Sequence, residues 1–182
     1  MRIIAGEFGS IRLKSLEGDN TRPTLDKVKE AIFSSIGTYF DGGKALDLFS
    51  GSGSLGLECI SRGMDKAYLN DKNIKAIKII KENINTLKVN DRVKVLNKDY
   101  RSALEMLSNE KFDFVYIDPP YALKCHEEIM KYLDTNQMIN EDGVVLIESA
   151  NEDVFEERYG SLEKYKEKIY GISRITYYRK GD

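Results

Sequence analysis

A strand, a glycine-rich loop and a helix follow one another directly between residues 44 and 62, and this order constrains the fold more than any other part of the chain. The apolar run over 44–49 predicts a buried strand. Three glycines in the loop over 50–56 permit a tight turn and let a ligand approach the backbone closely. A helix is expected over 57–62, ending at Gly63. This unit is typical of the first, cofactor-binding turn of a doubly wound parallel sheet.

Strands and helices alternate through the rest of the chain, which predicts an α/β fold with a mostly parallel sheet. Further strands are expected over 66–69, 92–96, 112–117, 143–147, 165–170 and 172–178. Helices are expected after Thr24 as far as Gly37, and over 74–87, 102–107, 127–133 and 152–159.

The N-terminal residues precede this alternating pattern. Residues 2–5 and 11–14 are expected to be two strands of a β-hairpin around a glycine-containing turn. At 182 residues the chain is most simply a single domain. We therefore expect a hairpin extension over 1–22 joined to a core over 23–182.

Four aspartates fall at or near the carboxyl ends of successive predicted strands: Asp47, Asp71, Asp99 and Asp118. Ligands of open α/β sheets bind at that edge. Carboxylates that share an edge without a ligand would repel one another. Asp71 follows Gly51 by 20 residues, a spacing at which an acid can accept hydrogen bonds from a ribose diol.

The segment Asp118-Pro119-Pro120-Tyr121 directly follows the strand predicted over 112–117. Neither proline has an N–H for a strand ladder, so the chain must leave the sheet here in a stiff turn. The turn holds a carboxylate, free carbonyls and an aromatic face in a small space. This arrangement of acceptors and an aromatic ring suits a planar ligand that carries an amine.

Composition excludes several classes of protein. No apolar run approaches the roughly 20 residues of a membrane span, and the N-terminus lacks the pattern of a signal peptide, so a cytoplasmic protein is expected. Cys59 and Cys125 are too far apart for a metal-binding pair and are expected to be reduced thiols. His126 is the only histidine, which argues against a histidine triad or a multi-histidine metal site. We expect no metal, and expect His126 to face solvent.

Charge is uneven, although the net charge is only −2. Residues 62–98 carry ten Lys/Arg and four Asp/Glu, whereas 141–163 carry eight acids and one arginine. The basic stretch can steer a phosphate backbone. Its lysines, Lys72, Lys75, Lys78 and Lys81, are more simply explained as the solvated face of a helix.

These motifs resemble known families. The segment from Leu46 to Glu58, followed by Ser61-Arg62-Gly63 and by Asp118-Pro119-Pro120-Tyr121, resembles class I S-adenosylmethionine-dependent methyltransferases. Arg2-Ile3-Ile4-Ala5-Gly6, Thr21-Arg22-Pro23-Thr24 and Lys29-Glu30-Ala31-Ile32-Phe33 are similar to the RsmD family. That family methylates the exocyclic N2 of one guanine in bacterial 16S ribosomal RNA. The resemblance implies a Rossmann-like core, a seven-stranded mostly parallel sheet with helices on both faces.

The resemblance also implies roles for the cofactor-binding residues. Asp47, Ser50, Gly51 and Gly53 would hold the methionine part of S-adenosyl-L-methionine, Asp71 its ribose hydroxyls and Asp99 its adenine amine, with Asp118 also near the cofactor. Asn70 departs from the family, which often has an apolar residue there, so either Asn70 or Asp71 could contact the ribose.

The residues expected to act on the substrate are in two places. Asp118 and the Pro119 carbonyl would accept hydrogen bonds from the target amine, Pro120 would stiffen the turn, and Tyr121 would stack on the base. Arg12, Lys14 and Arg22, with Arg2, are candidates to contact RNA phosphates. The alternative is a structural role, in which the hairpin closes the sheet.

The expected partner is 16S ribosomal RNA within a small-subunit particle or assembly intermediate, bound by a monomer. Three alternatives remain open. An amine methyltransferase could act on a DNA adenine or another RNA. Gly51-x-Gly53-x-x-Gly56 is also a dinucleotide fingerprint, so an NAD-binding oxidoreductase is a distant alternative. A non-catalytic nucleotide-binding module would leave the Asp118 turn idle.

Overall fold

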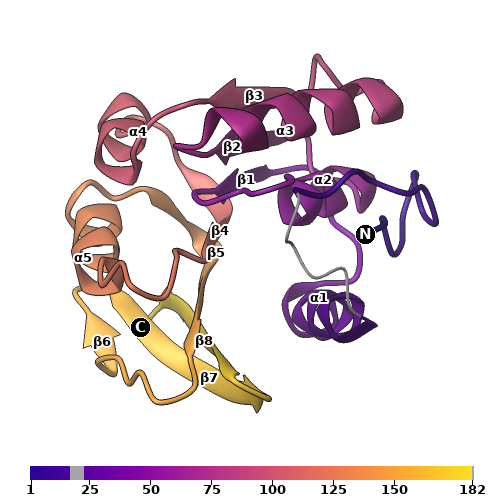
Figure 1. Ribbon diagram of the computed structural model, residues 1–182. Helices are drawn as coiled ribbons and strands as arrows, with labels where there is room; N and C mark the ends of the chain where they lie inside the picture. The colour runs from indigo at the N-terminus through magenta and orange to yellow at the C-terminus, as the bar shows by residue number, and fades with distance from the viewer. Residues whose placement is uncertain (17–22, 182) are drawn as a thin grey trace. The chain divides into compact units, whose positions relative to one another are not determined.

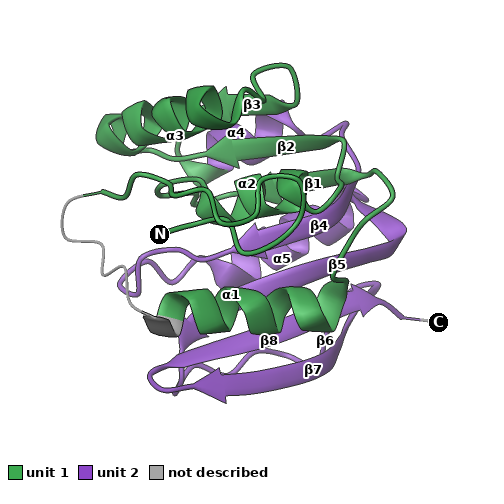
Figure 2. Cartoon of the chain, turned by 90° about the vertical axis from the view of Figure 1, so that its right-hand side faces the viewer, with its two compact units in different colours: residues 1–100 green, residues 101–182 purple. Residues whose placement is uncertain are grey.

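A computed structural model describes residues 1–16 and 23–181 of the chain (Figure 1). The chain divides into two compact units, Met1–Tyr100 and Arg101–Asp182 (Figure 2). The division falls at the start of helix α4, Tyr100–Met106.

Unit 1 contains three parallel strands in the order β3-β2-β1. The strands are β1 Lys44–Asp47, β2 Lys66–Asn70 and β3 Val93–Leu96, and the helices are α1 Pro23–Ile36, α2 Ser54–Ser61 and α3 Ile74–Leu87. Leu46, Leu57, Leu69 and Ile80 are fully buried between these elements. Since each crossover is a helix that returns the chain to a parallel strand, β1 and β2 end at the same edge of the sheet.

Helix α3 has the bounds that its periodicity predicts. The side chain of Asn73 caps its first turn by accepting from Lys75 N at 3.0 Å. Ile77, Ile80, Ile84 and Leu87 form its buried stripe, and Lys75, Lys78 and Lys81 lie on its exposed face.

Unit 2 contains five strands in the order β4-β5-β8-β7-β6. Strand β4, Phe112–Ile117, pairs in parallel with β5, Ile139–Ala150, and the remaining pairs are antiparallel. The other elements are β6 Arg158–Tyr159, β7 Leu162–Tyr170, β8 Ser173–Lys180 and helix α5 His126–Thr135. Tyr177 and Tyr178 of β8 are among the largest fully buried side chains.

The expected α/β fold with mostly parallel strands is confirmed, with one strand more than expected. The described residues form eight strands in place of seven, because the helix predicted over 152–159 is wrong. This segment is a loop that leads into β6. Val154 is 73% exposed, Phe155 packs on the His126 ring, and the buried Tyr159 belongs to β6. Between Asn151 and Arg158 the segment therefore has no continuous buried apolar stripe to support a helix.

The N-terminal hairpin is also less regular than expected, because a single bridge, Arg2↔Arg12, replaces the two predicted strands. Backbone bonds from Ile3 N to Ile11 O and from Leu13 N to Met1 O, both 2.9 Å, close the loop. The amides of Ile4 and Ala5 donate to the Glu58 carboxylate instead, so they cannot extend a strand ladder. The boundary proposed at 22/23 lies outside the described residues and stays a prediction.

No helix in the described ranges is long and apolar enough to cross a membrane.

Candidate functional site

Asp47 ends strand β1 and is a buried carboxylate with spare acceptor capacity. Its side chain is 2% exposed. Oδ2 accepts from Gly56 N at 3.3 Å, whereas Oδ1 has no hydrogen-bond donor among the residues that the structure describes. Burial raises the pKa of Asp47 to about 7, and the nearby Asp71 charge adds to the rise while the Gly56 N–H opposes it. A buried oxygen without a donor can accept a hydrogen bond from a bound ligand.

The glycine loop uses its glycines for two different purposes. Gly51 has φ 57°, and a Cβ at this position would meet no atom within 4 Å, so the backbone there borders open space. At Gly56 a Cβ would lie 2.1 Å from Leu69 Cδ2, so this glycine allows α2 to pack closely on β2. Gly53, with φ 82°, stands at the start of α2.

Asn70 and Asp71 differ sharply in what their side chains do. Asn70 is buried, and its Nδ2 donates to the carbonyls of Leu48 at 3.1 Å and Lys98 at 2.9 Å while its Oδ1 accepts from Lys98 N at 3.2 Å. Asn70 therefore ties together the segments that follow β1 and β3. The half-buried Asp71 accepts from Gly51 N at 2.9 Å and from Asn73 N at 2.8 Å. Because a carboxylate has about four acceptor sites, Asp71 can still accept from a diol.

Most of the unit 1 residues expected at the cofactor are linked by hydrogen bonds. Ser50 is buried, and its hydroxyl donates to the Asp47 carbonyl at 2.7 Å. Ser50 therefore shapes the loop. Asp99 lies after β3, directly before α4, and is exposed. These features fit a ligand that carries an ammonium group and a ribose diol. Asp47 Oδ1 is a buried acceptor for the ammonium, the backbone at Gly51 borders open space, and Asp71 at the end of β2 can accept from the diol.

The second group of expected residues lies in unit 2, where the chain leaves β4. Asp118 is half-buried, Pro119 is buried and Pro120 is exposed. The Pro120 carbonyl accepts from Leu123 N at 2.9 Å and closes the turn. Tyr121 is 45% exposed, so its ring is available to a ligand, and its hydroxyl lies 3.2 Å from Ser173 Oγ on β8.

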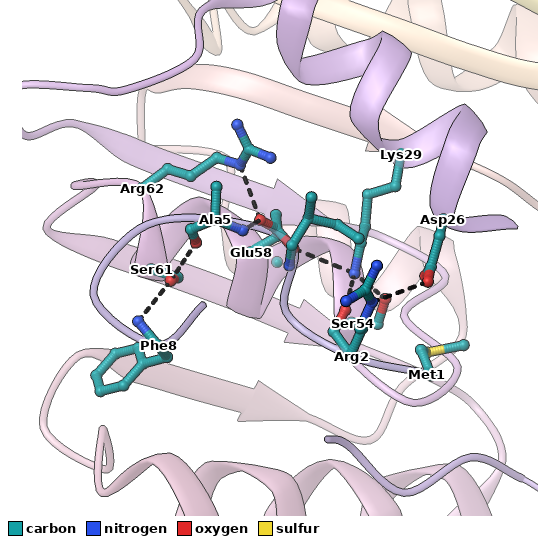
Figure 3. A network of polar contacts seen from close by, with 12 residues as sticks. Met1, Arg2, Ala5, Phe8, Asp26, Lys29, Ser54, Glu58, Ser61 and Arg62 are labelled. Atoms are coloured by element: carbon teal, nitrogen blue, oxygen red, sulfur yellow. Dashed lines mark hydrogen bonds and ion pairs between the residues drawn. The ribbon is translucent and has the colours of Figure 1, made fainter. Parts of the chain in front are cut away.

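A buried ionic cluster beside the glycine loop was not anticipated from the sequence (Figure 3). Glu58 of α2 is fully buried and accepts from Arg62 Nε at 2.8 Å and Lys29 Nζ at 3.2 Å. It also accepts from Ile4 N at 2.8 Å and Ala5 N at 3.0 Å. The Lys29 ammonium additionally donates to the Arg2 carbonyl at 2.7 Å, and burial lowers its pKa.

This cluster explains two of the family motifs. It joins the N-terminal segment, α1 and α2, the helix that follows the glycine loop. The sequence signal for this cluster is a glutamate within an apolar run, Leu57-Glu58-Cys59-Ile60.

The basic residues expected to contact RNA give a mixed result. Arg12 is exposed and takes part in the single bridge with Arg2. Lys14 Nζ pairs with Glu82 at 2.9 Å, with both side chains at least half exposed, and the Lys14 backbone bonds to Asn83. Arg22 lies outside the described residues.

His126 is buried, and the expectation that it faces solvent is wrong. Its ring packs on Phe155 with the centroids 4.9 Å apart, and burial lowers its pKa. Sequence position at a polar helix start was misleading because the loop that carries Phe155 covers it. Cys59 and Cys125 are free thiols and both are buried. Among the described residues no group of three or more His, Cys, Asp or Glu side chains is arranged to hold a metal ion.

The fold is that of the class I methyltransferases. A solved structure titled "Putative methyltransferase yhhF from Escherichia coli" matches this chain with a TM-score of 0.85 at 27% identity, covering 99% of this chain and 97% of that one. The family described as "Conserved hypothetical protein 95" matches residues 1–179, and the chain belongs to this family, the RsmD family.

Two relatives are similar over nearly their whole length. The Bacillus subtilis protein named "Putative rRNA methyltransferase YlbH" is 38% identical over 182 residues, which are 99% of each chain. The Haemophilus influenzae protein named "Ribosomal RNA small subunit methyltransferase D" is 31% identical over 183 residues, covering 98% of this chain and 93% of that protein. The resemblance stated from the motifs is therefore confirmed at the level of the family.

Proposed function

We propose that this protein transfers a methyl group from S-adenosyl-L-methionine to the exocyclic N2 amine of a guanine in bacterial 16S ribosomal RNA. One observation carries the proposal. The Asp118-Pro119-Pro120-Tyr121 turn, with an exposed ring beside a strand-end carboxylate, occurs in a member of the RsmD family. The names of two relatives, an rRNA methyltransferase and a small-subunit rRNA methyltransferase, support RNA as the substrate.

Unit 1 residues bind the methyl donor in this proposal. When bound, S-adenosyl-L-methionine supplies an activated methyl group on a sulfonium that leaves as a neutral thioether. The Gly51–Gly53 loop borders the methionine part, and Asp47 Oδ1, which is buried and without a donor in the described residues, accepts from its ammonium. Asp71 accepts from the ribose hydroxyls and Asp99 from the adenine amine.

Unit 2 residues orient the acceptor amine. The lone pair of a guanine amine is delocalised into the ring, which makes the nitrogen a poor nucleophile. The Asp118 carboxylate and the Pro119 carbonyl accept the amine N–H bonds, which fixes the direction of the lone pair and favours positive charge growing on nitrogen.

Tyr121 fixes the plane of the base by stacking, which contributes about 1–3 kcal/mol. A guanine in folded RNA has to leave its stack to reach the turn. In-line transfer from a sulfonium requires neither a metal ion nor a covalent nucleophile.

The cellular setting follows from this substrate. We propose that the protein acts in the cytoplasm, as a monomer, on a small-subunit particle or assembly intermediate. The base to be modified is then presented by an RNA fold that ribosomal proteins have already shaped.

Methylation with a labelled donor tests the proposal. The purified protein is incubated with naked 16S rRNA, with small subunits from cells that lack the enzyme, and with duplex DNA. We expect label at the N2 of a single guanine in the particle or the RNA. Label on an adenine amine of DNA, or on no nucleic acid, would contradict it.

A further inference from the structure

Three hydroxyl groups and a carboxylate form a chain of contacts that ends at Tyr121. Tyr116 of β4 donates through its hydroxyl to the Glu148 carboxylate on β5. Ser173 starts β8 and lies opposite Ala150 of β5, two residues from Glu148, so that its hydroxyl is within reach of the same carboxylate. Its Oγ also lies 3.2 Å from the hydroxyl of Tyr121. Neither Glu148 nor Ser173 belongs to any motif that carries the proposed chemistry.

The direction of this chain follows from its donors and acceptors. An ionised carboxylate only accepts, so the hydroxyls of Tyr116 and Ser173 both donate to Glu148. A serine hydroxyl has one hydrogen, and here Glu148 takes it. When Glu148 is ionised, Ser173 Oγ accepts from the Tyr121 hydroxyl, and this contact holds the tip of the phenol in place. Burial raises the pKa of Glu148, and the donors from Tyr116 and Ser173 oppose that rise.

Tyr121 is partly exposed, so a contact at its hydroxyl can restrain the ring. Its side chain is 45% exposed and projects from a turn that is closed by the bond from Leu123 N to the Pro120 carbonyl. An aromatic ring that is ordered before its ligand arrives loses less conformational entropy on binding.

We propose that Ser173 and Glu148 are positioning residues that hold the Tyr121 ring in the plane required to stack on the target base. The effect on RNA rests on the proposed function, whereas the ordering of Tyr121 does not. Glu148 acts through Ser173, and neither residue touches the reacting atoms.

The ordering is tested on the full chain without RNA or donor. Proteins labelled with 13C at the tyrosine ring are compared by NMR, and the Tyr121 signal is assigned by its loss in Tyr121→Phe. We expect Ser173→Ala to shift the Tyr121 signal and Ser173→Thr, which keeps the hydroxyl, to restore it. The matched control is Ser161→Ala. Ser161 lies on the turn between β6 and β7, and the substitution removes the 2.7 Å hydrogen bond from its hydroxyl to the Asp134 carboxylate. A Tyr121 signal unchanged in Ser173→Ala would overturn the inference, whether or not the protein methylates RNA.

The catalytic consequence is tested by steady-state kinetics with the RNA that the wild type methylates. Losing one neutral hydrogen bond should raise KM for RNA about 3- to 10-fold in Ser173→Ala, because stacking is made in the ground state as well. KM for the donor should stay unchanged, as should both constants in Ser161→Ala.

A double-mutant cycle completes the test. Ser173→Ala and Tyr121→Phe remove the same bond, so the double variant should lose no more than either single variant. Losses that multiply would show that the two residues act independently and would overturn the positioning role. If the wild type methylates no RNA, the proposed function fails while the NMR comparison still decides the ordering of Tyr121.

Discussion

Asp47 has a local environment far from that of an ordinary surface acid. One of its oxygens receives the Gly56 N–H, and the other is buried without a donor in the described part of the chain. Burial therefore destabilises its charged form and raises the pKa from 3.8 to about 7. In the free protein, the stability that the protonated carboxyl provides is lost as pH rises from about 4 through about 7.

The affinity for the donor should depend on pH through Asp47. An ammonium ligand needs the ionised carboxylate, so the affinity for S-adenosylhomocysteine should fall by up to about tenfold per pH unit below about pH 7. Calorimetric titration across this range measures it. Asp47→Asn should bind more weakly and with a flatter profile, and an unchanged slope in that variant would exclude Asp47 as the titrating group.

Residues next to a motif in sequence were easier to predict than residues that reach it through the fold. Strand-end acids and the proline turn are adjacent to their strands, so Asp47, Asp71 and Asp118 could be placed from sequence. Ser173 comes close to Glu148 only because β5 and β8 pair, with Ala150 opposite Ser173. That register is not readable from local pattern. Asn70 was ambiguous in sequence, and only its three backbone contacts reveal a structural role.

At the scale of elements, helix α2 contributes both to the glycine loop and to the buried ionic cluster. Its N-terminus follows the glycine loop, and its middle carries Glu58, which holds the N-terminal segment and α1 through Lys29. A buried carboxylate with two cationic partners is costly to disrupt, because the partners are left buried and unpaired.

Glu58→Ala should therefore destabilise the protein by about 3–5 kcal/mol, since it leaves Lys29 and Arg62 without their counter-ion. Urea unfolding measures the loss. The matched control is Glu82→Ala, which removes the partner of Lys14 from an exposed pair and should cost no more than about 1 kcal/mol. Equal losses in the two variants would show that the buried cluster contributes no more to stability than the exposed pair.

The predictability of elements depended on how strongly each buries one face. Helix α3 has a continuous isoleucine and leucine stripe, and its bounds were predicted correctly. The segment over 152–159 is rich in acids, and its two aromatics, Phe155 and Tyr159, pack as a loop residue and a strand residue, so the predicted helix is absent. The N-terminal hairpin is less regular than predicted. The Glu58 carboxylate of α2 accepts from the Ile4 and Ala5 amides, which would otherwise bond to a neighbouring strand.

At the scale of the molecule, charge is segregated although the total is −2. RNA binding by such a protein depends on local basic surface and on salt. Arg12 and Lys14 of the N-terminal loop are both exposed and are candidates for phosphate contacts.

Reversing both charges tests these contacts. Arg12→Glu/Lys14→Glu should weaken binding of 16S rRNA and reduce the slope of log affinity against log salt by about 0.7–0.9 per lost contact. Filter binding at several salt concentrations measures the slope. Lys111→Glu/Lys131→Glu makes the same change in net charge at two exposed lysines of unit 2 and should leave the slope unchanged. Equal effects of the two double variants would favour a structural role for the N-terminal loop.

The central claim assigns donor binding to unit 1 and amine orientation to the turn after β4. Asp118→Ala separates the two in one comparison, with methyl transfer to RNA and the affinity for S-adenosylhomocysteine measured on the same preparation. We predict that transfer falls below detection while the affinity changes by no more than about threefold, since the groups that hold the donor are intact. Methyl transfer that survives the substitution would contradict the account.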